Sequence, residues 1–174
     1  MKKISLISTF CDTEIKLKTL KQNITKVKKI GVDVMVISPL HLPKDITDLC
    51  DYYFETKDNP LLKWPIRAYT HWYKHNHPEG RILEMHRGLA DYGWAALYQF
   101  KILSKIALAL DYDMFYHIIY DLEIDNVIEQ EFLANKNIVH PRRNPKNLNE
   151  IWETNLHFVA LNRELMEKLK KILH

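Results

Sequence analysis

Residues 111–125 have the sequence DYDMFYHIIYDLEID, and its centre, MFYHIIY (114–120), is a short run rich in aromatic and branched side chains. A run of this length and composition is typical of a buried strand in the middle of a sheet. It ends in three carboxylates, Asp121, Glu123 and Asp125. In open α/β sheets the ligand crevice lies beyond the carboxyl ends of the strands. We therefore expect the chemical centre of the chain at Asp121-Leu122-Glu123.

The composition is that of an ordinary globular domain. The chain has 174 residues, of which 47% are hydrophobic and 27% are charged, and this size predicts one domain over residues 1–174. The net charge of +3 is small and its basic residues are spread out, so nucleic acid is not an expected partner. No segment is long and uncharged enough to span a membrane. The cysteines, Cys11 and Cys50, have no CxxC spacing, which favours reduced thiols and a cytoplasmic location.

Strand and helix patterns alternate along the chain. Branched runs predict strands and apolar residues at helical spacing predict helices. The expected strands are 4–9, 32–38, 51–56, 114–120, 136–139 and 156–161, and the expected helices are 15–30, 44–50, 93–110, 126–135 and 162–173. This order predicts an α/β fold, a Rossmann-like, mostly parallel sheet flanked by helices. Asp12 or Thr13 should cap the first long helix, and Gly31 should end it.

Two segments do not fit this alternation. Residues 61–81 contain Trp64, Trp72 and three histidines between prolines, and we interpret them as an aromatic and histidine-rich insertion. The cluster at 140–145, HPRRNP, predicts an irregular basic loop that could clamp a phosphate or carboxylate, or could simply be solvated.

Acidic pairs lie on both sides of the central strand, but only one lies at the ligand end. Seven strand residues at about 3.3 Å each separate Asp111 and Asp113 from Asp121 and Glu123 by roughly 20 Å. Two oxygen ligands one residue apart suit Mg²⁺ or Mn²⁺ that also holds a diphosphate. The alternative is structural, in that Asp121 could cap the helix that follows.

Other reactive side chains carry weaker patterns. His71 and His75 are four residues apart, as zinc ligands can be, but no HExxH motif or third ligand accompanies them, which favours exposed or stacking histidines. Cys11 could be a nucleophile, but the sequence pairs it with no base, so a small residue lining a pocket is the better interpretation.

Four stretches resemble the nucleotide-sugar-binding half of GT-A-type glycosyltransferases, the nucleotide-diphospho-sugar transferase superfamily, in its bacterial and viral members. They are ISLISTF (4–10), VDVMVISPLHLP (32–43), DYYFETKDNPLL (51–62) and MFYHIIYDLE (114–123). The last is similar to the strand leading into a DxD motif, although Glu123 stands where that motif has its second Asp. The resemblance covers roughly residues 1–135.

This resemblance implies a nucleotide-diphospho-sugar donor, most naturally a UDP-sugar, with transfer to a glycan or other hydroxyl acceptor. It implies Mn²⁺ or Mg²⁺ on Asp121 and Glu123. Ser8, Thr9 and Phe10 would line the base pocket. Further donor contacts would come from Asp58, near the base or ribose, and from Lys101, at a phosphate. The general base stays open between Asp125 and Glu153, and the resemblance leaves open a homodimer or a partner domain.

Two other functions remain open from the sequence. A sugar nucleotidyltransferase would use a glycine-rich phosphate loop after the first strand, and the chain, with only 4 glycines, has none. A non-catalytic α/β interaction module would instead use the 61–81 insertion as its contact surface.

Overall fold

A six-stranded sheet in the order β3-β2-β1-β4-β6-β5 forms the centre of the molecule. The structure, a computed structural model, describes residues 1–56, 92–143 and 152–172. The strands are β1 (Lys3–Ser8), β2 (Asp33–Ser38), β3 (Tyr52–Glu55), β4 (Met114–Ile119), β5 (Ile138–Arg143) and β6 (Trp152–Asn162). The predicted α/β class and the central place of the 114–120 run are confirmed, since β4 pairs with strands on both sides.

The sheet is parallel on one side and antiparallel on the other. β3, β2, β1 and β4 pair in parallel, whereas β6 pairs antiparallel with both β4 and β5. The sheet is therefore mixed, with β6 the one described strand that runs against the others. β1 connects to β2 on one side, whereas β4 lies on its other side, so the strand order reverses between β1 and β4.

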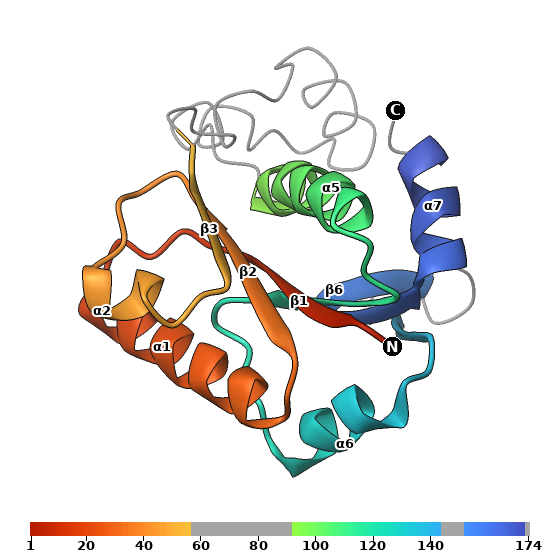
Figure 1. Ribbon diagram of the computed structural model, residues 1–174, viewed down its shortest axis with the longest axis horizontal. Helices are drawn as coiled ribbons and strands as arrows, with labels where there is room; N and C mark the ends of the chain where they lie inside the picture. The colour runs from red at the N-terminus through yellow and green to blue at the C-terminus, as the bar shows by residue number, and fades with distance from the viewer. Residues whose placement is uncertain (57–91, 144–151, 173–174) are drawn as a thin grey trace, which may run out of the picture.

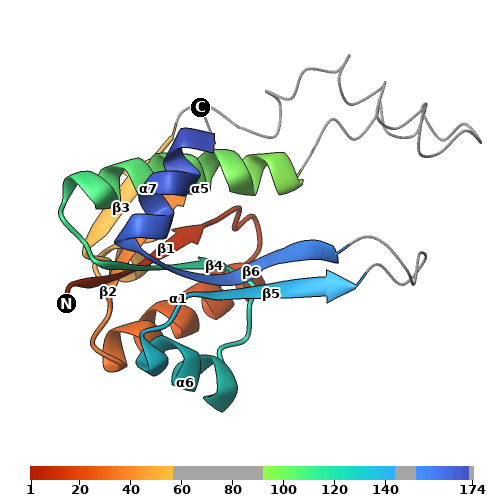
Figure 2. The same cartoon turned by 90° about the vertical axis from the view of Figure 1, so that its right-hand side faces the viewer.

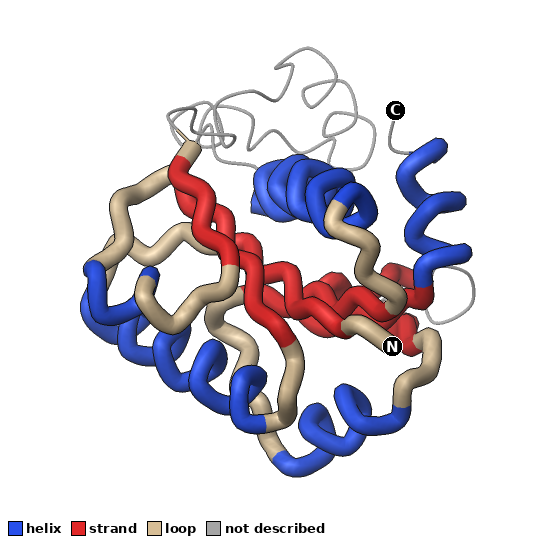
Figure 3. The backbone as a smooth tube through the Cα atoms, in the orientation of Figure 1, coloured by secondary structure: helices blue, strands red, loops and turns tan. Residues whose placement is uncertain are grey.

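Helices cover both faces of the sheet (Figures 1, 2 and 3). Those of the described residues are α1 (Glu14–Lys29), α2 (Lys44–Thr47), α5 (Tyr92–Ala109), α6 (Asn126–Ala134) and α7 (Arg163–Ile172). α1 and α6 lie on one face, and α5 and α7 lie on the other (Figure 2). None of these helices combines the length and the apolar character that a membrane span requires.

The alternation of side chains along the strands builds one core layer on each face. On the α1 and α6 side, Ile7, Val36 and Tyr116 pack against helix residues such as Leu20 and Phe132. On the opposite side, β-strand residues pack against buried residues of α5 and α7, among them Phe100, Leu103 and Met166. Both layers contain fully buried side chains of β1 and β4, so these two strands are packed against helices on both faces of the sheet.

The first long helix begins and ends as its sequence predicts. The Thr13 side chain caps α1 by accepting from the Lys16 backbone N–H at 3.4 Å. Gly31 follows the helix with a φ of 80°, a left-handed conformation that glycine adopts without strain. α2 is shorter than the predicted 44–50 helix, and turn-type hydrogen bonds continue from it to Cys50.

The prediction of an irregular basic loop at 140–145 is wrong for residues 140–143. His140 to Arg143 continue β5, which pairs with residues 152–155 of β6. Pro141 is tolerated because β5 is the edge strand, where one N–H needs no partner, and a register shift between Val139 and His140 adjusts the pairing. The long partner strand β6 overrides the local turn chemistry of the prolines.

The acidic pair at the other end of β4 has a structural role. The Asp113 carboxylate accepts from the Lys2 backbone N–H at 2.7 Å, and Asp111 forms an ion pair with Arg163 at 2.6 Å. These contacts join the start of β1 and the start of α7 to the start of β4. The prediction that the two acidic pairs lie at opposite ends of the strand is thereby confirmed.

Candidate functional site

The carboxyl ends of β1 and β4 meet at the point where the strand order reverses. Ser8 is in register with Ile119, so the residues that follow, Thr9 and Phe10 on one strand and Tyr120 and Asp121 on the other, leave the sheet side by side. In open α/β sheets this switch point is where ligands bind. We call the segment Tyr120–Asp125 the acidic loop.

Side chains of α1 brace the acidic loop through its backbone. The amide nitrogen of Asn23, whose side chain is buried, donates to the carbonyl oxygens of Tyr120 at 3.0 Å and Leu122 at 2.7 Å. The Lys26 ammonium donates to the Ile124 carbonyl at 2.5 Å. With these carbonyls satisfied and Ile124 buried in the core, the loop is held from within, while Asp121 and Glu123 stay exposed.

Replacing Asn23 tests this brace. Asn23→Ala removes the donor that both carbonyls share, and leaving these partly buried acceptors without that partner should lower the free energy of unfolding by about 1–3 kcal/mol. Urea denaturation measures this loss, and faster amide exchange at residues 121–124 should accompany it.

The exposed neighbour Gln22 supplies the matched control. Gln22→Ala, on the same helix, should change stability by less than about 0.5 kcal/mol. Equal effects of the two substitutions would show that the amide contacts contribute nothing to the loop.

Asp125 has a different role from the other two acids. Its Oδ1 accepts from the backbone N–H groups of Val127 at 3.0 Å and Ile128 at 2.9 Å, which makes it the N-cap of α6. The alternative that Asp121 caps this helix is therefore wrong. A catalytic role for Asp125 remains a prediction, now set beside a structural role that the sequence interpretation did not assign to it.

The Lys16 ammonium lies between the residues that follow β1 and those that follow β4. The Lys16 Nζ lies 5.9 Å from the ring centroids of both Phe10 and Tyr120, and 2.5 Å from the Asp12 carboxylate. The Asp12 hydrogen bond raises the pKa of Lys16, so the ammonium stays charged at neutral pH. The side chain comes from the first turn of α1, where the chain has just left β1.

The Asp121 carboxylate affects the pKa values of Tyr120 and Cys11, which lie near Lys16. Burial raises the pKa of Tyr120, Lys16 opposes that rise, and Asp121 and Cys11 add to it. Burial likewise raises the pKa of Cys11 to about 12, and Asp121 contributes to the increase. Cys11, which follows β1, and Asp121, which follows β4, thus both act electrostatically on Tyr120.

The residues expected to line a base pocket differ in accessibility. Ser8 and Thr9 are buried, with exposed fractions of 4% and 2%. The Ser8 hydroxyl lies 3.5 Å from His117 Nε2, and the Thr9 hydroxyl donates to the Ile37 carbonyl at 3.1 Å. Phe10 is half-buried, so its ring is the accessible side chain of the three.

Two further predicted contacts fall elsewhere. Lys101 is half-buried on α5, where its carbonyl accepts from the Ser104 hydroxyl at 3.0 Å, and no described contact brings its ammonium to the acidic loop. Asp58 lies outside the described residues, as does the 61–81 insertion with Trp64 and Trp72.

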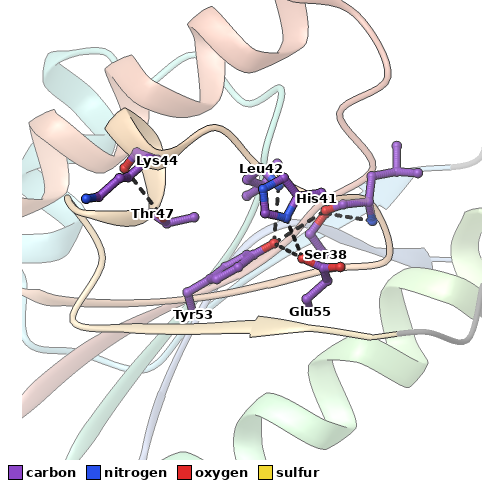
Figure 4. A network of polar contacts seen from close by, with 8 residues as sticks. Ser38, His41, Leu42, Lys44, Thr47, Tyr53 and Glu55 are labelled. Atoms are coloured by element: carbon purple, nitrogen blue, oxygen red, sulfur yellow. Dashed lines mark hydrogen bonds and ion pairs between the residues drawn. The ribbon is translucent and has the colours of Figure 1, made fainter.

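A polar network at the ends of β2 and β3 was not anticipated from the sequence (Figure 4). The His41 Nδ1 lies 2.8 Å from Glu55 Oε2, and the Tyr53 hydroxyl donates to the same oxygen at 3.3 Å. Ser38 bonds to the backbone of Leu40 and so shapes the turn that presents His41. Only the β2–β3 register brings these residues together, because His41 and Glu55 are 14 positions apart.

The described residues fit a metal only together with a ligand. Among residues 1–56, 92–143 and 152–172, no group of three or more His, Cys, Asp or Glu side chains is placed to hold an ion. Asp121 and Glu123 supply two exposed carboxylates. Mg²⁺ is commonly bound by one or two carboxylates plus substrate phosphates, so these donors fit an ion that arrives with a diphosphate.

Comparison with known proteins gives a weak structural likeness and no sequence match. No protein-family model and no curated protein sequence matches the chain. A glycosyltransferase involved in the glycosylation of the major capsid of PBCV-1 resembles it in structure at 12% sequence identity and a TM-score of 0.49. The match covers 99% of this chain and 64% of that protein, so the chain spans less than two thirds of its length. A likeness of this extent says nothing about activity.

Proposed function

We propose that this chain is a glycosyltransferase, or the donor-binding domain of one, that binds a nucleotide-diphospho-sugar at the β1–β4 switch point and transfers the sugar to a hydroxyl acceptor. The observation that carries the proposal is the acidic loop: two exposed carboxylates on a braced segment at the ligand end of a parallel pair of strands. The GT-A-type family suggested by the sequence patterns is the finer form of this proposal.

The chemistry of the site suits a diphosphate. The Lys16 ammonium, held by its ion pair with Asp12, lies beside the Phe10 and Tyr120 rings, and these rings offer faces on which a nucleoside can stack. Asp121 and Glu123 would hold Mn²⁺ or Mg²⁺, which neutralises charge on a leaving diphosphate when bound. Asn23 and Lys26 bond to the backbone of the loop, so the two carboxylates come from a braced segment.

Substitution of the metal-binding pair tests the proposal. Asp121→Asn should weaken Mn²⁺-dependent UDP binding at least tenfold, because the ion loses a charged ligand. Glu123→Gln should act in the same direction. Calorimetry with UDP, GDP and CDP, with and without Mn²⁺, measures the effect.

Stability provides the control for this experiment. Asp121 is exposed, so Asp121→Asn should leave the free energy of unfolding within about 1 kcal/mol of the wild-type value. Asp48→Asn, at another exposed carboxylate, should change neither binding nor stability. Wild-type protein that binds none of the three nucleotides with metal would refute the proposal.

Binding of a protein partner is the second candidate, and one surface feature favours it. A shallow hollow of about 500 Å³ lies on α6 and is lined by Asn126, Val127, Gln130, Glu131 and Ala134. Val127, in this hollow, is 65% exposed and presents an apolar side chain to solvent. A partner that binds without metal or nucleotide and is lost in Val127→Asp would favour this function.

A further inference from the structure

The His41–Glu55–Tyr53 network has the arrangement of an oriented base. An ionised Glu55 can only accept hydrogen bonds, so the 2.8 Å contact places the proton of the neutral imidazole on Nδ1. The other nitrogen, Nε2, then carries a lone pair. The His41 side chain is 82% exposed, and so this lone pair faces solvent at the edge of the sheet.

Glu55 is itself held in place. The Tyr53 hydroxyl donates to Glu55 Oε2 at 3.3 Å and accepts from the Leu42 backbone N–H at 3.3 Å. Burial raises the pKa of Tyr53, and the Glu55 charge adds to the rise, so the hydroxyl keeps its proton and remains a donor. The Lys44 side chain extends away from the His41 ring in Figure 4, which leaves Glu55 and Tyr53 as the titratable groups drawn against it.

This network lies on the same edge of the sheet as the acidic loop. β2 and β4 both pair in parallel with β1, so their carboxyl ends are two strand spacings, about 10 Å, apart. His41 follows the end of β2 and bonds to Glu55 at the end of β3, so it faces the acidic loop from the other side of β1 along this edge. The sequence patterns did not single out His41, and the candidates for the general base were Asp125 and Glu153.

We propose that His41 is the general base of the transfer reaction and that Glu55 is its positioning residue. The inference rests on the function proposed above. The acceptor oxygen forms a bond to the anomeric carbon as the bond from that carbon to the diphosphate oxygen breaks. The diphosphate leaves with the bonding electron pair, and the acceptor proton moves to His41 Nε2. The Glu55 carboxylate then stabilises the imidazolium through its Nδ1–H.

The experiment compares binding with turnover. His41→Gln removes the base, and the release of UDP from UDP-glucose, with octyl glucoside and water as acceptors, should fall on the order of 100-fold. The dissociation constant for UDP with Mn²⁺ should stay within twofold of wild type. Glu55→Gln should lower the rate less and change its pH profile, because the imidazolium loses its stabilising charge. Lys44→Gln, at an exposed neighbouring residue, should leave rate and binding unchanged.

The outcomes separate this inference from the proposed function. The pH profile of the release rate should differ between the wild type and His41→Gln. A protein that binds UDP normally but whose release rate does not depend on His41, or is absent with both acceptors, overturns the base assignment and leaves donor binding standing. Loss of nucleotide binding in the wild type overturns both.

Discussion

Phe132→Ala is expected to lower the free energy of unfolding by about 3–5 kcal/mol, the usual effect of removing a fully buried aromatic side chain. The Phe132 ring has no exposed surface and lies 4.6 Å from the Tyr116 ring and 5.3 Å from the Phe158 ring. It therefore joins α6 to two strands of the sheet. Urea denaturation measures the loss, and the melting temperature should drop by roughly 10 °C.

The next residue on the same helix is the control. Leu133 is 50% exposed, and Leu133→Ala should cost less than about 1 kcal/mol. The Tyr116 hydroxyl donates to the Phe132 carbonyl at 2.9 Å, and this backbone contact survives the substitution, so the comparison isolates the ring. A loss below about 1 kcal/mol for Phe132→Ala would contradict the packing of α6 against the sheet.

The fold was predictable because local patterns and tertiary packing agree along most of the chain. The apolar run at 114–120 becomes β4 at the centre of the sheet, and the long apolar helix before it becomes α5. Thr13 and Gly31 mark the ends of α1, where the required backbone geometry follows from the residue type. The miss at Pro141 has the opposite cause, since pairing with a distant strand decided its conformation.

The site was predictable in location but not in its supporting residues. Asp121 and Glu123 follow β4 at the switch point, as the strand-end rule expects, and their role as metal ligands stays a prediction. Asn23 could have been noticed as a polar residue on the apolar stripe that Leu20, Ile24 and Val27 form. The contact of His41 with Glu55, in contrast, depends on the register of two strands, which residue spacing along the chain does not contain.

The thiol of Cys11 is expected to react about 10³-fold more slowly with iodoacetamide at pH 8.5 in the native protein than in the urea-unfolded chain. Burial raises its pKa from 9.0 to about 12. Only the thiolate reacts, and a pKa higher by three units lowers the thiolate fraction about a thousandfold. Its exposed fraction of 5% slows the reagent further. Alkylation followed by mass spectrometry measures the two rates.

Cys50 must be removed from this comparison, because burial also raises its pKa to about 12. Cys50→Ser keeps a donor for the Ile46 carbonyl and leaves Cys11 as the single thiol.

Because the Cys11 pKa is higher in the folded state, the unfolded chain loses its proton first as the pH rises past 9. The free energy of unfolding should therefore fall between pH 9 and 12, and adding Cys11→Ala should remove this part of the dependence. Rapid alkylation of native Cys11 would instead support the nucleophile interpretation.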